Sequence, residues 1–232
     1  MKRYRHLFFD LDHTIWDFEA NSRQTLMELF ESMDLAARGV NDFDLFHKYY
    51  LAHNEKLWDR YRKGFIKVDE LRWKRMWLAL LDFKIADEKL ASEMGVVFLD
   101  RLPTRTILFP YATEILDYLT GKAYRLHLIT NGFEKTQHSK LKHSGLDKYF
   151  QEVITSESSN SLKPHKEIFE YALSKTRAGQ QDSIMIGDSL EVDIQGAMNA
   201  GLDQVFVNHL HEQTEMKPTY TVYSLKELEK IF

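Results

Sequence analysis

The stretch FFDLDHTIWD, residues 8–17, contains three aspartates directly after an apolar run. Residues 4–9 (YRHLFF) have the composition of a short buried strand, so Asp10 and Asp12 follow the end of a predicted core strand. Burying two like charges this close together costs free energy unless another group compensates for it. The stretch therefore raises the question of which group compensates, and residues further along the chain bear on the answer.

The composition limits the classes of protein to consider. The chain has 232 residues, enough for one large domain or a core with a smaller partner domain. It is 44% hydrophobic and 28% charged, with a formal net charge of -4 and no long block of like charge, which argues against an electrostatic nucleic-acid footprint. It contains no cysteine and no apolar run near the ~18 residues of a membrane-spanning helix. Since the N-terminal residues also lack the pattern of a signal peptide, we expect a soluble, cytoplasmic protein that binds neither a nucleic acid polymer nor a membrane.

The spacing of the apolar residues differs between two parts of the sequence. From Asp17 to about Leu102 the apolar residues are spaced by three and four, which predicts roughly four helices and no strand. After Pro110, short apolar runs alternate with amphipathic segments, which predicts a parallel sheet with helices on both faces. The predicted strands are 125–130, 152–155, 183–187 and 204–208, and the predicted helices are 111–120, 134–145, 165–176, 191–200 and the closing SLKELEKIF, 224–232. We therefore predict an α/β core domain, 1–16 and 103–232, with an all-helical domain, 17–102, inserted after the first strand.

Polar residues follow four of the predicted strands. In open α/β sheets, ligands bind outside the carboxyl ends of the strands. The residues there are Asp10, Asp12 and Thr14 after the first strand, Thr130 and Asn131 after the second, Lys163 after the third, and Asp188 with Asp193 after the fourth. Carboxylates suit Mg²⁺ and an ammonium group suits phosphate, so the set predicts metal-assisted chemistry on an anionic ligand.

Four motifs carry a family resemblance. DLDHT, ITNG, LKP and GDSLEVD, in this order, resemble the four motifs of the haloacid dehalogenase (HAD) superfamily of aspartate-nucleophile phosphohydrolases. The resemblance spans the chain and implies a HAD-like Rossmannoid sheet with an inserted helical cap of the C1 type. DLDHTIWDF, NEKLWDRYRKGFI, ITNGF and SLKELE are similar to the noncanonical pyrimidine 5'-nucleotidase subfamily, which dephosphorylates nucleoside monophosphates.

The resemblance also implies a role for each of these residues. Asp10 would be the nucleophile that forms an aspartyl-phosphate, and Asp12 the acid for the leaving oxygen and then the base for water. The cofactor would be Mg²⁺, whose charge offsets the paired acids and whose ligands would be Asp10, the Asp12 carbonyl and Asp188. Thr130, the backbone of Asn131 and Lys163 would bind the phosphoryl group. Thr14 and Asp193 would support the site, and His13 and Trp58 are the possible substrate-specificity residues.

The sequence alone also allows other interpretations of the motifs and of the function. Each motif also fits ordinary turn or helix-cap chemistry, and His209-Leu-His211-Glu212 is more typical of a polar loop than of a metal site. A sugar-phosphate or phosphoglycolate phosphatase, a β-phosphoglucomutase-like mutase and a HAD-fold binding module are the alternative functions. The sequence departs from the family at His13 and Tyr111, where relatives often carry glycine. We expect the partner to be a small-molecule phosphate ester and the protein to be a monomer or weak homodimer.

Overall fold

The structure is a computed structural model and describes residues 4–232. The chain divides into two compact units: the first comprises the described residues up to Phe18 together with Thr106–Phe232, and the second is Glu19–Arg105. We propose that these units correspond to the predicted core domain, 1–16 and 103–232, and the predicted cap domain, 17–102. Residues 1–3 of the predicted core range lie outside the described residues.

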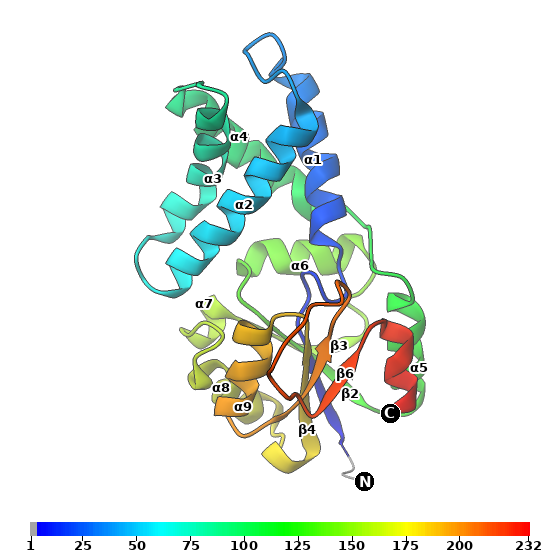
Figure 1. Cartoon of the computed structure of the whole chain (residues 1–232). Coiled ribbons are helices and arrows are strands. Elements are labelled where there is room, and N and C mark those ends of the chain that lie inside the picture. The colour runs from blue at the N-terminus through cyan, green and yellow to red at the C-terminus, as the bar shows by residue number, and fades with distance from the viewer. Residues whose placement is uncertain (1–3) are drawn as a thin grey trace. The chain divides into compact units, whose positions relative to one another are not determined.

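Within the described residues, the first unit is built on a parallel sheet of six strands in the order β3-β2-β1-β4-β5-β6 (Figure 1). The strands are β1 (His6–Phe9), β2 (Arg125–Thr130), β3 (Phe150–Thr155), β4 (Ser183–Gly187), β5 (Asp203–Val207) and β6 (Tyr220–Val222). Every residue of β1 is buried, as expected for a central strand of a sheet that is covered on both faces. The predicted α/β fold class is confirmed.

The register of β1 determines which strand ends meet. Phe9 pairs with Leu128 of β2 and with Ile186 of β4, so the carboxyl ends of these three strands lie side by side. The amide of Asp10 continues the ladder and donates a hydrogen bond to the carbonyl of Ile186 at 2.9 Å. Polar residues that follow β1, β2 and β4 are therefore brought to one edge of the sheet.

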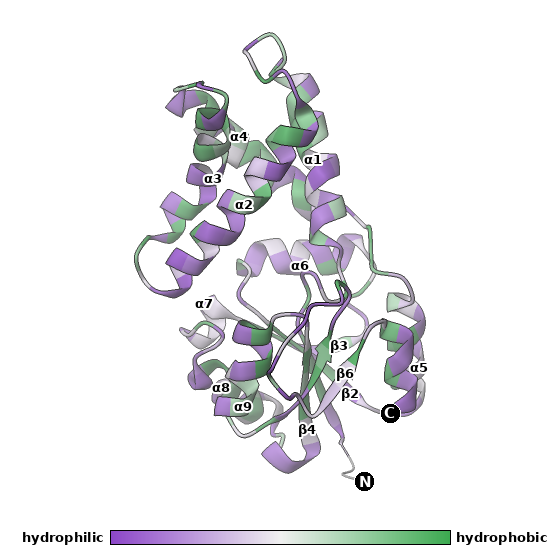
Figure 2. Ribbon diagram, in the orientation of Figure 1, coloured by the Kyte–Doolittle hydropathy of each residue, from purple (hydrophilic) through white to green (hydrophobic). Residues whose placement is uncertain are grey.

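Helices cover both faces of this sheet. The helical segments of the unit are α5 (Ala112–Gly121), α6 (Glu134–His143), α7 (Ser156–Ser159), α8 (Lys166–Thr176), η2 (Gln180–Asp182), η3 (Leu190–Gln195), α9 (Gly196–Asn199) and η4 (Leu225–Lys230). The consecutive residues Phe8 and Phe9 point to opposite faces and are both completely buried. Phe8 belongs to a core cluster with residues of α8 and α9, and Figure 1 shows α5 and η4 on the other side of the sheet. In Figure 2 the strands are largely hydrophobic, whereas the helices mix both kinds of residue.

The second unit consists almost entirely of helices, as predicted. They are α1 (Phe18–Ser32), α2 (Phe43–Arg62), α3 (Val68–Asp82) and α4 (Glu88–Arg101), followed by the short η1 (Leu102–Thr104). Asp42 and Asp87 cap α2 and α4, because each side chain accepts a hydrogen bond from a backbone amide of the first turn. In the part of the chain that the structure describes, no helix is long and apolar enough to cross a membrane.

Several elements differ in kind from the prediction. Strand β6 was not predicted, and the Ser-rich SESSNS contains the short helix α7. The predicted helix 191–200 is a π-helical segment, η3, followed by α9. The predicted closing helix is a 3-10 helix, η4.

Candidate active site

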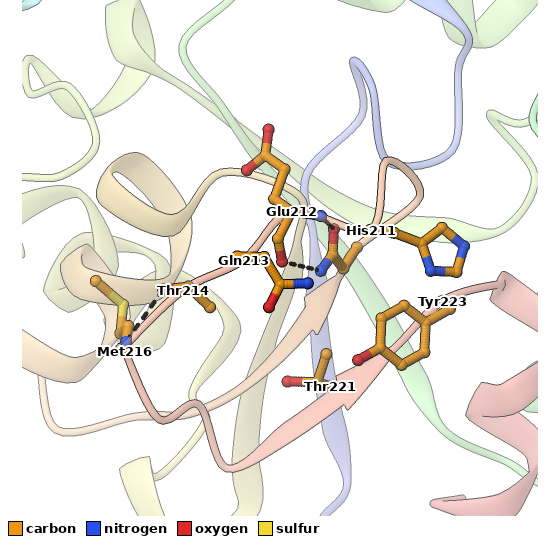
Figure 3. A pocket seen from close by; sticks show the side chains of 8 residues that line it. His211, Glu212, Gln213, Thr214, Met216, Thr221 and Tyr223 are labelled. Carbon is orange, nitrogen blue, oxygen red and sulfur yellow. Dashed lines mark hydrogen bonds between the residues drawn. The ribbon is translucent and has the colours of Figure 1, made fainter.

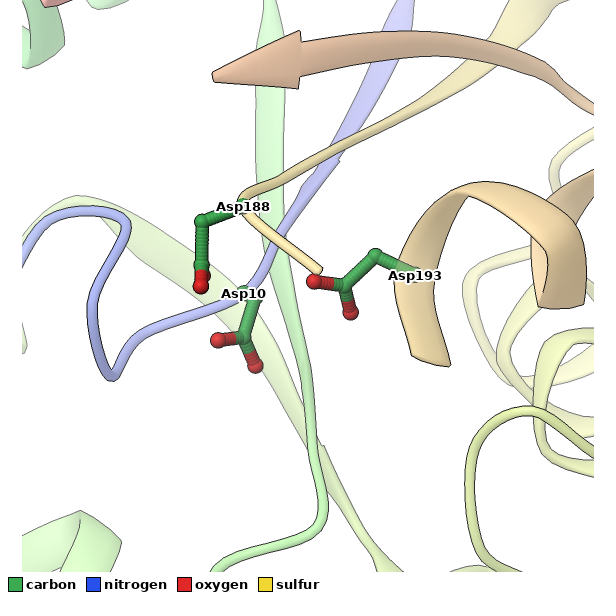
Figure 4. A group of neighbouring side chains, drawn as sticks. All are labelled: Asp10, Asp188 and Asp193. Carbon is green, nitrogen blue, oxygen red and sulfur yellow. The ribbon is translucent and has the colours of Figure 1, made fainter. Parts of the chain in front are cut away.

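Three carboxylates meet at the edge of the sheet (Figure 4). Asp10 follows β1, Asp188 follows β4 and Asp193 lies in η3. Each residue offers one carboxylate oxygen, and these oxygens lie within 4.8 Å of one another. A set of hard oxygen donors at this spacing fits Mg²⁺, which prefers carboxylates and water over nitrogen or sulfur.

Lys163 is the cation of this cluster. Its buried Nζ donates to Oδ1 of Asp10 at 2.6 Å and to Oδ1 of Asp193 at 2.7 Å. Burial alone would lower the pKa of Lys163, but the two carboxylates outweigh burial and raise it, so the ammonium stays charged. Burial raises the pKa of Asp10 well above its ordinary value and raises the pKa of Asp188 to about 7. One ammonium does not balance three carboxylates, and a divalent cation would supply the missing positive charge.

The local backbone of η3 explains how Asp193 reaches Lys163. The amides of Asp193 and Ile194 both donate to the carbonyl of Ser189, at 2.9 and 3.1 Å, which gives the wide turn of a π-helix. The Asp193 carboxylate accepts a hydrogen bond from the Ser189 amide at 3.1 Å and lies against Gly187. A Cβ atom at Gly187 would overlap this carboxylate, so the close approach requires glycine.

Thr14 connects the first motif to the fourth. Its buried hydroxyl donates to Oδ1 of Asp188 at 2.7 Å. The loop that carries it is closed by a hydrogen bond from the amide of His13 to the carbonyl of Trp16, at 2.9 Å. The arrangement holds Asp188 beside Asp10, which agrees with a supporting role for Thr14.

Asn131 connects the second motif to the third. Its side-chain amide donates to the carbonyl of Lys163 at 2.9 Å and accepts from the Lys163 amide at 2.8 Å. The prediction assigned only the Asn131 backbone, to phosphate. The side chain has a further effect that was not predicted, because it fixes the backbone from which Lys163 reaches Asp10.

Thr130 is oriented to donate a hydrogen bond. Its hydroxyl oxygen accepts from the Gly132 amide at 3.0 Å and from Nε2 of Gln137 at 2.6 Å. With both lone pairs engaged, the hydroxyl proton can serve an acceptor such as a phosphoryl oxygen.

Asp12 has two partners that the sequence analysis did not identify. Lys140 donates from Nζ to Oδ1 at 2.5 Å, and Gln137 donates from Nε2 to Oδ2 at 2.9 Å. Burial raises the pKa of Asp12, but Lys140 and Gln137 outweigh burial and hold the pKa below its ordinary value. Both partners come from α6, directly after the second motif. Their spacing of three residues places them on one helix face, but the almost wholly polar sequence of α6 gives no sign that this face is buried.

The two possible specificity residues are placed differently. His13 adjoins Asp12, is exposed, and has its ring centroid 5.1 Å from that of Phe18. Trp58 lies in α2 of the second unit, with its ring centroid 5.8 Å from that of Tyr61. The roles of His13 and Trp58 therefore stay predictions.

A separate pocket lies in the loop after β5 (Figure 3). It has a volume of about 300 Å³ and is lined by Asn208, His211, Glu212, Gln213, Thr214, Met216, Thr221 and Tyr223. The His211 and Tyr223 rings stack at 4.8 Å, and the Asn208 side chain bonds the backbone of Glu212. Within residues 4–232, the acidic and histidine side chains close enough to share a metal ion are those at Asp10, so this pocket agrees with a polar loop.

Comparisons with known proteins point to the same chemistry. A family model described as haloacid dehalogenase-like hydrolase matches residues 4–201. Pyrimidine 5'-nucleotidase PynA of Streptococcus pneumoniae is 35% identical over 229 residues, covering 97% of this chain and 93% of the relative. Pyrimidine 5'-nucleotidase YjjG of Escherichia coli is 35% identical over 233 residues, covering 97% and 96%. The crystal structure of YfnB from Bacillus subtilis bound to magnesium has a TM-score of 0.90 at 30% identity, covering 99% of each chain.

Proposed function

Because the chain belongs to the haloacid dehalogenase-like hydrolase family and is an enzyme of the HAD phosphatase type, we propose that it is a Mg²⁺-dependent nucleoside 5'-monophosphate phosphatase. The observation that carries this proposal is the contact of Asp10 with Lys163 beside Asp188, with Asp12 two residues further on. Two relatives named as pyrimidine 5'-nucleotidases, each 35% identical along almost the whole chain, support nucleotides as substrates.

The first half of the proposed reaction transfers the phosphoryl group to the enzyme. A carboxylate oxygen of Asp10 attacks phosphorus, and the bond from phosphorus to the ester oxygen breaks. Asp12 is held as a carboxylate in the unliganded enzyme, so it first takes up the proton of the bound phosphate monoanion and then gives it to the leaving oxygen. The nucleoside leaves as an alcohol and an aspartyl-phosphate remains. Lys163, the Thr130 hydroxyl and the Asn131 backbone bind the phosphoryl oxygens.

The second half returns the enzyme to its starting state. Water attacks the phosphorus of the aspartyl-phosphate and gives a proton to Asp12. The bond between phosphorus and Asp10 then breaks, which restores the Asp10 carboxylate, and Asp12 returns to its carboxylate form as it gives its proton to the departing inorganic phosphate.

Asp10, Asp188 and the backbone carbonyl of Asp12 would hold Mg²⁺, with Asp193 positioned between Lys163 and the backbone of Ser189. When bound, the ion supplies positive charge that offsets the repulsion between the carboxylates and the phosphoryl oxygens. We further propose a cytoplasmic location for the enzyme, with His13 and Trp58 contributing to the choice of leaving group.

A hydrolysis panel tests the proposal. Nucleoside 5'-monophosphates, sugar phosphates and phosphoglycolate are each assayed for phosphate release with Mg²⁺ and with excess EDTA, and Asp10→Asn serves as the inactive control. We expect pyrimidine nucleotides to have the highest kcat/KM and EDTA to abolish turnover. A sugar phosphate that exceeds every nucleotide by tenfold, about 1.4 kcal/mol of transition-state free energy, would instead identify a sugar phosphatase or mutase. Absence of turnover on every ester would identify a binding module.

A further inference from the structure

Two buried polar side chains of α6 are unexplained by the roles assigned so far. Gln137 is completely buried and Lys140 is 3% exposed, although both sit in the almost wholly polar sequence EKTQHSKLKH. Burying an amide and an ammonium costs free energy unless each is matched with partners. Each donates to a different oxygen of the same carboxylate, that of Asp12. We propose that Gln137 and Lys140, here called the Asp12 clamp, are positioning residues that hold Asp12 in the orientation for proton transfer to the leaving oxygen.

The geometry of the contacts restricts Asp12 strongly. Asp12 lies in a loop, where its side chain would otherwise choose among several rotamers. The clamp fixes Oδ1 by the 2.5 Å contact with Lys140 and Oδ2 by the 2.9 Å contact with Gln137. Since both donors stand on one helix, rotation of the carboxylate breaks at least one contact. An error of about 1 Å in the position of a reacting group can cost about a hundredfold in rate.

Lys140 is itself fixed by its surroundings. Its Nζ lies 4.3 Å from the ring centroid of Trp16, and the Trp16 side chain is completely buried. A cation over an indole face is attracted by the ring, so the ammonium is held between the ring and the carboxylate. Trp16 also pairs through its backbone with Asp12 and Leu108, so the ring belongs to the same loop framework as the acid.

Gln137 links the proposed acid to the proposed phosphate site. A carboxylate only accepts hydrogen bonds, so the nitrogen of the Gln137 amide must face Asp12. The same nitrogen donates its second hydrogen to the Thr130 hydroxyl. Asp12 and Thr130 are therefore held at a fixed separation by one amide group. A Cβ atom at Gly132 would overlap the Gln137 side chain, which explains the glycine of ITNG at this position.

The inference rests on the proposed function, and its test uses two substrates that differ in their need for an acid. A nucleoside 5'-monophosphate leaves as an alkoxide unless it is protonated, whereas p-nitrophenyl phosphate leaves as a stable phenolate. Lys140→Met removes the donor but keeps a side chain of similar length over Trp16. Lys142→Met, an exposed lysine of the same helix, is the matched control.

We expect Lys140→Met to lower kcat/KM for the nucleotide about a hundredfold and for the aryl phosphate less than about tenfold, within the usual range of general acid catalysis. KM should change little, since Lys163, Thr130 and Asn131 are untouched. Lys140→Arg, which keeps the charge and the donors, should recover much of the nucleotide activity. The control should match the wild type on both substrates. Thermal unfolding monitored by circular dichroism verifies that each variant folds, and Gln137→Met with the same substrate pair replaces Lys140→Met if that variant does not fold.

Equal losses on the two substrates, or no loss on either, would overturn the clamp while leaving the proposed function intact. A failure of the proposed function looks different, because the wild type itself would then fail to hydrolyse the nucleotide. A wild type that hydrolyses only sugar phosphates would be tested for the clamp with a sugar phosphate as the alkyl ester.

Discussion

At the scale of single residues, His13 and Tyr111 carry side chains on backbone in the left-handed region, with φ of 64° and 69°. Such a conformation costs an L-residue about 1–2 kcal/mol relative to the right-handed one, whereas glycine adopts it freely. Tyr111 has a compensating contact, because its hydroxyl donates to Oε1 of Glu229 at 2.6 Å. The side chain of His13 is exposed, and its ring contacts that of Phe18 without a side-chain hydrogen bond of the kind that Tyr111 makes. Glycine would adopt the backbone conformation of both positions without this cost.

Replacing His13 and Tyr111 by glycine separates the cost of the left-handed backbone from the stabilisation by side-chain contacts. We expect His13→Gly to raise the free energy of unfolding by about 0.5 kcal/mol, because relief of the left-handed backbone exceeds the entropy that glycine loses on folding. We expect Tyr111→Gly to lower it, because the contact with Glu229 is lost. Urea unfolding of the two variants and the wild type measures both changes. A destabilised His13→Gly variant would mean that the imidazole makes a contact worth more than the strain.

Lys163 and Lys166 provide a second comparison between nearby lysines. The ammonium of Lys163 is buried between Asp10 and Asp193, whereas Lys166 makes an exposed pair with Glu170 at 3.2 Å. Removing one partner of a buried ionic group leaves uncompensated charge, so Lys163→Met should lower the free energy of unfolding by about 3 kcal/mol. Lys166→Met should change it by less than about 0.5 kcal/mol. The measurement is urea unfolding in buffer without divalent ions, and equal effects of the two substitutions would contradict the argument.

At the scale of elements, helices and strands were predicted most accurately where the local pattern of apolar residues is strongest. β2 and β4 have the bounds that were predicted, because each is a short segment centred on apolar residues between polar segments. β6 has three residues at the edge of the sheet, too few to show an alternation. The apolar residues of η4 and its end, Leu225, Leu228 and Ile231, are spaced by three throughout, which suits a 3-10 helix better than the predicted α-helix.

The residues of the candidate site likewise divide into those that the sequence predicts and those that it does not. Residues in the motifs could be named from the sequence because they follow strand ends. The clamp residues Gln137 and Lys140 could not, because a polar helix gives no compositional sign of which polar side chains are buried. Their burial depends on the loop from Asp12 to Trp16, which lies more than a hundred residues earlier in the chain.

The pairing of β1 with β2 creates a buried histidine pair that predicts a pH dependence. Nδ1 of His6 lies 3.0 Å from Nε2 of His127, and Nδ1 of His127 is buried without a partner among the described residues. Burial, with smaller effects from His6 and Arg125, lowers the pKa of His127 from 6.5 to about 4. Burial also lowers the pKa of His6, where Asp182 opposes it and Arg5 and Arg125 add to it. The pair is therefore neutral in the folded protein.

The sign of the effect follows from proton uptake. Between pH 6.5 and about 4 the unfolded chain binds a proton at His127 that the folded protein does not. The stabilisation is complete above pH 6.5 and is lost as the pH falls toward 4. We expect a loss of about 2 kcal/mol from this residue, less than the full shift implies because solvent screens part of it. Urea unfolding across this range should show a shallower acid limb in His127→Leu than in the wild type. His138→Leu, exposed on α6, should keep the wild-type slope.

At the scale of the whole molecule, the acidic cluster exists only in the folded chain. Its members, Asp10, Lys163, Asp188 and Asp193, come from three motifs spread over most of the sequence. The unfolded chain scatters them, so a divalent ion that binds the cluster binds the folded protein alone. Metal affinity and global stability are therefore linked.

This linkage gives a test of the Mg²⁺ site that does not depend on activity. At a Mg²⁺ concentration of about 100 times Kd, binding to the folded state alone adds about 2.7 kcal/mol. For a chain of this size that should raise Tm by about 5–10 °C. Asp188→Asn removes one half-buried carboxylate from beside two others, so the variant should be more stable than the wild type in EDTA and should lose most of the shift with Mg²⁺. Differential scanning fluorimetry in EDTA, in Mg²⁺ and in NaCl of matched ionic strength measures the Tm of both proteins without metal and the shift that Mg²⁺ causes in each. The NaCl series separates binding from general screening. An equal Mg²⁺ shift in the wild type and in Asp188→Asn would mean that the ion binds elsewhere. Mg²⁺ at this site would then not be the charge that compensates the paired aspartates at the end of β1.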